Sequence, residues 1–155
     1  MTPITWLVAG LGPALQLLPP TMDTPEARAM LTAIALQESR LQHRRQIQGP
    51  ARSYLQFEQG GIAGVLRHHA SKPHALEVLS ELDYPADTGA LHAAFEHNDV
   101  LAAAFGRLLL FTLPQKLPGP HQADAAWGQY IDAWRPGKPH RETWDNFFIS
   151  AWSIV

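Results

Sequence analysis

The hydrophobic and polar positions of the chain follow a helical period most clearly between residues 25 and 43. Positions 27, 31, 34, 38 and 41 have the spacing of one helical face, and all except position 38 are apolar. The preceding residues Asp23-Thr24-Pro25-Glu26 supply a capping side chain, a proline at the first helical position and an acid in the first turn. We therefore predict a helix from Pro25 to about His43.

The rest of the chain shows further short segments of helical spacing, separated by many of its 13 prolines and 11 glycines. No run of alternating residues is long enough to indicate a strand, and no internal repeat is present. The predicted class is all-α, a single domain over residues 1–155 with about eight short helices. Besides the helix from Pro25, the expected helices lie at Ile62–His68, Pro73–Leu82, Asp87–Glu96, Asn98 or Asp99 to Phe111, Gln122–Trp134 and Arg141–Ile154.

The apolar N-terminal segment Ile4–Leu18 has some of the character of a signal peptide. It lacks a basic start, contains Pro13 and ends in Pro19-Pro20 instead of a small-residue cleavage site. It is also too short and too interrupted to span a bilayer. We expect a buried helix of the fold, with no signal peptide of its own and no membrane span.

Charge and composition exclude several classes of function. The net charge is −2, so the chain lacks the basic surplus typical of nucleic-acid binding. There is no cysteine, which removes thiolate metal sites and cysteine nucleophiles. The adjacent histidines His68 and His69 point in different directions on a helix, and no HExxH pattern occurs, so we predict neither a metal nor a cofactor.

Glu38 is the most informative single residue, because it is a carboxyl group within an apolar helical face. Removal from water disfavours the charged form of a carboxyl group and raises its pKa, as protonation of a glycosidic oxygen requires. The alternative is that Glu38 reaches solvent at the helix end and pairs with Arg44 or Arg45. The basic cluster from Arg40 to Arg45 is expected to complement the helix dipole, or to contact a glycan or a protein partner.

The residues around Glu38 resemble the lysozyme-like lytic transglycosylases, whose catalytic helix ends in Glu-Ser and is followed by a Gly-Leu-Met-Gln segment. In this chain Glu38-Ser39 is followed by Ala51-Arg52-Ser53-Tyr54-Leu55-Gln56, and 18 residues separate Glu38 from Gln56, similar to the family's spacing. Ala51 matches the family's alanine, and Ser53, Tyr54, Leu55 and Gln56 match its glycine, leucine, methionine and glutamine. This resemblance covers about residues 25–61.

A longer likeness covers most of the chain. The string LQESRLQHRRQIQGPARSYLQFEQGG and the segment Trp134–Pro139 are similar to a group of tailed-phage proteins of lysozyme-like type. The likeness implies a phage-encoded protein, in the virion or the host cell, that acts on the periplasmic cell wall. Its implied partners are peptidoglycan glycan strands and phage virion proteins.

The resemblance implies a lysozyme-like fold and cleavage of the β-1,4 bond between N-acetylmuramic acid and N-acetylglucosamine. Glu38 would be the single catalytic acid, protonating the leaving oxygen and then taking a proton from the muramyl 6-hydroxyl to form a 1,6-anhydro sugar. The substrate-binding residues implied are Ser39, Arg52, Tyr54, Gln56 and Tyr130. Arg52 is the candidate for a peptide-stem carboxylate, with a structural salt bridge as its alternative.

The chain departs from the family pattern in three places. The hydroxyl residue that the family has about midway between Glu38 and Gln56 falls near Ile47. Ser53 replaces the glycine, which puts the tight turn there in doubt, and the later Tyr-Asn-Ala-Gly segment is absent, with Phe105-Gly106 in its place. Tyr130 is then the best substitute for the missing tyrosine. These departures leave open a non-catalytic virion structural protein with the same fold, or a sugar-binding module. A lysozyme using Glu58 as a second carboxylate also remains open.

Overall fold

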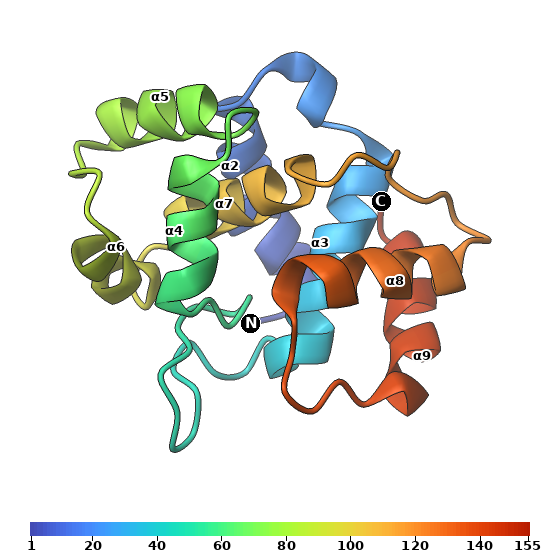
Figure 1. Cartoon of the computed structure of the whole chain (residues 1–155). Coiled ribbons are helices and arrows are strands. Elements are labelled where there is room, and N and C mark those ends of the chain that lie inside the picture. The colour runs from blue at the N-terminus through green and yellow to red at the C-terminus, as the bar shows by residue number, and fades with distance from the viewer.

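The computed structural model describes all residues, 1–155, and its regular elements are all helices (Figure 1). The only strand-like features are two isolated bridges, which pair Arg45 with Arg52 and Arg52 with Phe57. With the continuous N-terminal run counted once, there are eight helices, as predicted. They are the run formed by α1 (Pro3–Thr5), a π-helical segment (Trp6–Leu11) and α2 (Gly12–Gln16), then α3 (Pro25–Ser39), α4 (Gln59–Arg67), α5 (Lys72–Leu82), α6 (Thr88–Phe95), α7 (Asp99–Phe111), α8 (Ala123–Trp134) and α9 (Arg141–Trp152), with a 3-10 turn at Pro20–Met22.

The N-terminal run continues through Pro13 because its middle segment is a π-helix. Proline has no N–H to donate, and the wider turn places the Gly12 N–H on the carbonyl of Leu7, five residues earlier. Gly12 is needed there, since an added Cβ would lie 2.8 Å from the Leu7 oxygen. One side of the run is buried, with Trp6, Leu7, Leu11 and Leu15 in the core. No helix of the protein has the length and apolar character needed to cross a bilayer.

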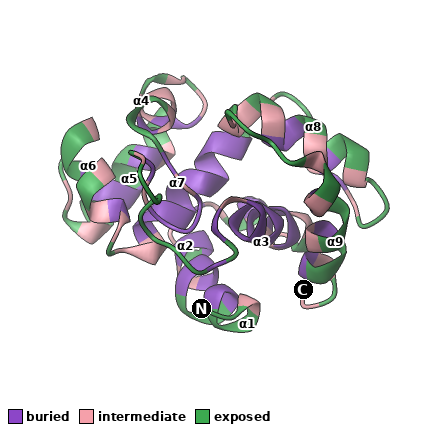
Figure 2. Cartoon of the chain, turned by 90° about the horizontal axis from the view of Figure 1, so that it is seen from below, coloured by how far each residue is buried: buried purple, intermediate pink, exposed green.

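Helix α3 occupies the centre of the molecule. It begins as predicted, with the Thr24 hydroxyl accepting the Ala27 N–H at 3.1 Å. It is buried on nearly all sides instead of along one stripe, because α9, α7 and the N-terminal run pack around it (Figure 2). The predicted end at His43 is wrong: the helix ends at Ser39, since Arg40 and Leu41 both adopt left-handed backbone angles, with φ of 57° and 56°.

The other helices form two groups on either side of α3 and α7. Helix α4 packs against α5 and α6, and all three pack against α7, while α8 packs on α9 (Figures 1 and 2). The starts of α6 and α7 are those that the sequence predicts, capped by Asp87 and Asn98. Helix α4 begins before the expected Ile62, and α9 ends before the expected Ile154.

Candidate active site

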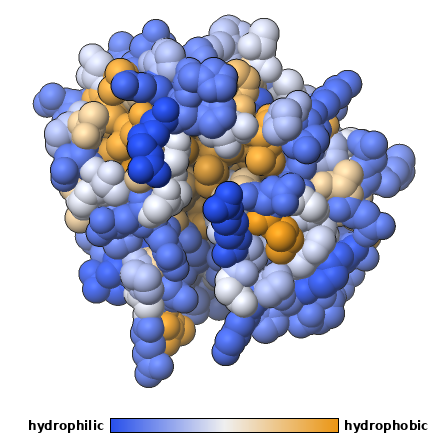
Figure 3. All heavy atoms as spheres, viewed as in Figure 1, coloured by the Kyte–Doolittle hydropathy of each residue, from blue (hydrophilic) through white to orange (hydrophobic).

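A cleft of about 1130 Å³ lies between the two groups of helices. One wall is α4, and the other is the end of α8 with the segment that joins it to α9. The end of α3, with Leu109 of α7 and the two residues that follow α7, forms the base. Figure 3 shows this hollow on the face of the molecule, with apolar atoms exposed inside it and polar side chains around it. Among the residues that line it are Glu38, Gln56, Glu58 and Tyr130.

Glu38 lies in the last turn of α3, half-buried at the base of the cleft. Its Oε1 accepts a hydrogen bond from the Tyr130 hydroxyl at 2.5 Å. Burial raises the pKa of the Glu38 carboxyl to about 7; the Tyr130 hydrogen bond opposes this rise, and the negative charge of Glu58 adds to it. A large share of Glu38 side chains is therefore protonated at neutral pH, as a general acid requires.

Tyr130 is held in place by the aromatic side chains behind it. Its ring stacks on Trp144, with centroids 5.2 Å apart and planes within 7°. Burial raises the pKa of its hydroxyl, and the negative charge of Glu38 raises it further, so that the hydroxyl remains a donor. Tyr130 was expected to bind substrate, and it does line the cleft. Its hydroxyl, however, donates to Glu38, so its role in this structure is to position the acid.

Gln56 lies on the same cleft as Glu38, in the turn before α4. Its Nε2 donates to the Ser53 carbonyl at 2.7 Å, and its own backbone is left-handed, with φ of 53°. Ser53 is left-handed as well, with φ of 70°, the conformation that glycine adopts most easily. The tight turn is thus kept despite the serine, whose hydroxyl accepts the Leu55 N–H at 3.1 Å.

Three of the substrate-binding candidates do not line the cleft. Ser39 is buried, and its hydroxyl donates to the carbonyl of Tyr54 at 2.7 Å. Tyr54 is buried too, with its ring edge against Trp6. The Arg52 guanidinium donates to the carbonyls of Gly49 and Ala51, and its Nε lies 3.7 Å from the Glu96 carboxylate, so the alternative of a structural salt bridge is confirmed. Ser39 therefore joins the end of α3 to the following loop, and the other two side chains are likewise engaged within the protein instead of facing the cleft.

The alternative in which Glu38 pairs with Arg44 or Arg45 is wrong. Arg44 pairs with Asp99 at 2.9 Å, and Arg45 pairs with Glu96 at 2.8 Å. Arg40, the remaining arginine of that cluster, donates to the last carbonyls of α3, as the helix dipole favours. Glu38 has no cationic partner that would hold it ionised.

The segment Trp134–Pro139, noted in the sequence only for its likeness to phage proteins, lines the cleft along its whole length. Gln37 fixes this segment, because its Nε2 donates to the carbonyls of Pro139 and His140 at 2.8 and 3.0 Å. Sequence analysis did not assign residues 135–139 to the site. The break Arg-Pro-Gly-Lys-Pro directly after the helix that carries Tyr130 was the available signal.

Glu58 is the residue that the sequence offers as a second carboxylate beside Glu38. It is exposed at the N-cap position of α4, lines the cleft and makes no capping hydrogen bond. Both groups line the same cleft, and the negative charge of Glu58 adds to the rise in the pKa of Glu38. No group of three or more His, Asp or Glu side chains is placed to hold a metal ion.

The raised pKa of Glu38 predicts a pH dependence of stability that can be measured without a substrate. Folding raises this pKa from 4.5 to about 7, so the folded protein keeps a proton that the unfolded chain releases. The stabilisation is fully present below pH 4.5 and is lost as the pH rises through 7. We expect the unfolding free energy of the wild type, minus that of Glu38→Gln, to fall by about 3 kcal/mol over this range. Denaturant titrations at several pH values test this, and a constant difference would contradict the raised pKa.

Comparison of the chain with models of protein families, with curated proteins and with solved structures gives no match. The site consists of one half-buried acid, held by a tyrosine, at the base of an open cleft.

Proposed function

We propose that the protein cleaves the glycan strands of peptidoglycan, as a lytic transglycosylase with Glu38 as its general acid and base. The observation that carries the proposal is the protonatable Glu38 carboxyl group, half-buried and hydrogen-bonded at the base of a cleft large enough for several sugar rings. The likeness of residues 25–61 to that family supports it. We propose further that the protein is phage-encoded and acts on the periplasmic cell wall.

In the proposed reaction the protonated Glu38 transfers its proton to the glycosidic oxygen, and the bond from that oxygen to the muramyl C1 breaks. Tyr130 holds Oε1, which leaves Oε2, without a hydrogen-bond partner, to face the sugar. The substrate's own N-acetyl group stabilises the positive charge at C1. The Glu38 carboxylate then takes the proton of the muramyl 6-hydroxyl, whose oxygen closes the 1,6-anhydro ring on C1. Glu38 ends protonated, as it began.

Hydrolysis is the second candidate, and one observation favours it. Glu58 lines the same cleft and acts electrostatically on Glu38. Lysozymes that hydrolyse use two carboxyl groups, one as acid and one as nucleophile or base. The exposed position of Glu58 argues for the single-acid reaction, because a base or nucleophile is usually held in place by its neighbours.

The proposal is tested by incubating the full chain with purified peptidoglycan and measuring the soluble fragments released. We expect release by the wild type, with turnover falling as the pH rises above 7, because the acid form of Glu38 is then lost. A folded protein that binds peptidoglycan but releases no soluble fragments would refute the proposed enzymatic activity. It would favour a virion structural protein or a sugar-binding module.

Tyr130→Phe tests how the acid is tuned. The change keeps the ring that stacks on Trp144 but removes the donor to Glu38. That hydrogen bond lowers the pKa of Glu38, so its loss should raise the pKa above about 7 and move the upper limit of activity to higher pH. Stability should fall by only about 0.5–1.5 kcal/mol. An NMR titration of the Glu38 carboxyl carbon in both proteins measures the shift, and an unchanged or lower pKa in the variant contradicts this role.

A further inference from the structure

The arginine side chains fall into two groups. Seven of the nine arginines in the sequence make hydrogen bonds or ion pairs within the protein: Arg28, Arg40, Arg44, Arg45, Arg52, Arg107 and Arg141. Arg67 and Arg135 make neither, and both line the cleft that contains Glu38. The arginines without a partner are thus found at the site and nowhere else in the molecule.

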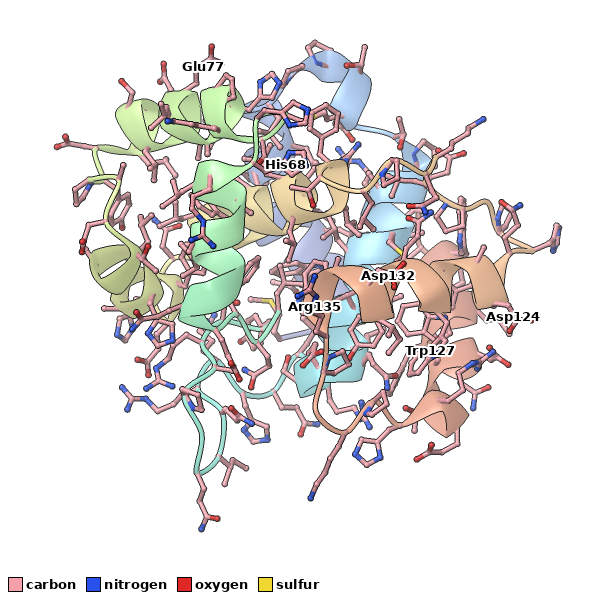
Figure 4. All side chains as sticks on the ribbon, viewed as in Figure 1. His68, Glu77, Asp124, Trp127, Asp132 and Arg135 are labelled. Atoms are coloured by element: carbon pink, nitrogen blue, oxygen red, sulfur yellow. The ribbon has the colours of Figure 1, made fainter.

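The two free arginines lie on opposite walls of the cleft. Arg67 is the last residue of α4 and is exposed. Arg135 directly follows α8, also exposed, and Figure 4 shows it at the end of that helix nearer to α4. Lys138, in the same segment, is a third cation of the cleft without an ion pair. The acids Glu58 and Asp132 line the cleft too, but neither forms an ion pair with these cations.

The wall beside Arg67 is open because α4 presents glycines to the cleft. A Cβ added at Gly60 or Gly64 would have no atom within 4 Å, so no side chain fills this space. A ligand can therefore lie against α4 within reach of the Arg67 guanidinium. Guanidinium groups match the planar geometry of a carboxylate and bind it through paired hydrogen bonds. A neutral sugar offers no such group.

We propose that Arg67 and Arg135 form a subsite that binds the carboxylates of a peptidoglycan strand, one on each wall of the cleft. This proposal rests on the proposed function. It gives these two arginines the role of binding a peptide-stem carboxylate, which the sequence suggested for Arg52; the Arg52 guanidinium is instead engaged by backbone carbonyls. The carboxylates come either from the stem peptides or, where these are removed, from the lactyl group of the muramyl sugar. The subsite selects anionic glycans over neutral ones such as chitin.

The test measures binding in a Glu38→Gln background, in which the glycan is not consumed. The full chain is co-sedimented with purified peptidoglycan sacculi, and Arg67→Gln/Arg135→Gln is compared with Lys72→Gln/Lys116→Gln. The control removes the same charge from two exposed lysines outside the cleft. We expect the arginine pair to weaken binding at least roughly tenfold, since a single hydrogen bond to a charged group already contributes that much. The lysine pair should leave binding unchanged.

Two further ligands distinguish the possible sources of the carboxylate. A loss confined to peptide-bearing sacculi identifies the stem peptides, and a loss with peptide-free glycan strands shows that the lactyl carboxylate is bound where the peptides are removed. Equal losses with neutral chitin oligomers, equal losses in the lysine control, or no loss at all would overturn the subsite. Arginine-dependent binding by a wild type that releases no fragments would refute the proposed enzyme and leave the subsite standing. Cleavage by the wild type, together with unchanged affinity in the arginine variant, would support the proposed enzyme and overturn the subsite.

Discussion

Glu38→Gln should abolish the cleavage of peptidoglycan and leave the fold intact. Glutamine has nearly the shape of glutamate and keeps an oxygen that can accept the Tyr130 hydrogen bond, but it has no proton to transfer. General acid catalysis typically contributes roughly 100- to 10,000-fold to a rate, and we expect a loss in this range. Stability should hold or rise at neutral pH, because a neutral amide avoids the cost of keeping a carboxylate half-buried. Fragment release and thermal unfolding of the same samples measure both effects.

Glu58→Gln is the matched control for this variant, since it removes the cleft carboxyl group whose charge acts on Glu38. With a single catalytic acid we expect most of the activity to remain, and the pKa of Glu38 to fall, because the negative charge that helps to raise it is gone. An activity loss as large as that of Glu38→Gln would make Glu58 catalytic and favour hydrolysis. Full activity in folded Glu38→Gln would overturn the assignment of the acid.

Trp144→Ala should cause the largest loss of stability. Trp144 is fully buried in α9, donates its indole N–H to the Ala123 carbonyl at 2.9 Å and carries the ring of Tyr130. Truncating a buried tryptophan leaves a cavity and typically costs about 3–5 kcal/mol. Because Tyr130 would lose the surface that positions it, activity should fall even where the variant remains folded. Denaturant unfolding, with activity measured well below the midpoint, separates the two effects.

Ile149→Ala provides the comparison within the same helix. Ile149 is 65% exposed, so its truncation should change the unfolding free energy by no more than about 0.5 kcal/mol and leave activity unchanged. Equal destabilisation by the two variants would show that α9 does not support the site through Trp144.

The sequence predicted the helical elements well wherever local signals decide the structure. The caps at Thr24, Asp87 and Asn98 are made by single side chains within one turn, and the helices begin where these residues predict. The end of α3 was missed, because it depends on left-handed angles at Arg40 and Leu41 that no glycine signals. The full burial of α3 was missed as well, since it follows from how distant helices pack around it.

The candidate site was predictable in part. Glu38 was found from its place among apolar residues, and Gln56 from its spacing in a known motif; the structure places both on one cleft. Arg52 was assigned to a ligand because its chemistry fits, with a salt bridge as the alternative; its partners are carbonyl groups of its own loop and the carboxylate of Glu96. Arg67 and Arg135 were missed because they are distinguished by having no partner within the protein. The sequence does not show which arginines find a partner when the chain folds.

The most direct test of the single-acid reaction is mass analysis of the fragments released from purified peptidoglycan by the wild type, with Glu38→Gln as the blank. Closure of the 1,6-anhydro ring by the muramyl 6-hydroxyl adds no water, whereas hydrolysis adds one water to each new end. We predict muramyl ends one water lighter than hydrolysed ends, and none of them with Glu38→Gln. Hydrated reducing ends alone, or equal release by both proteins, would contradict the proposed reaction.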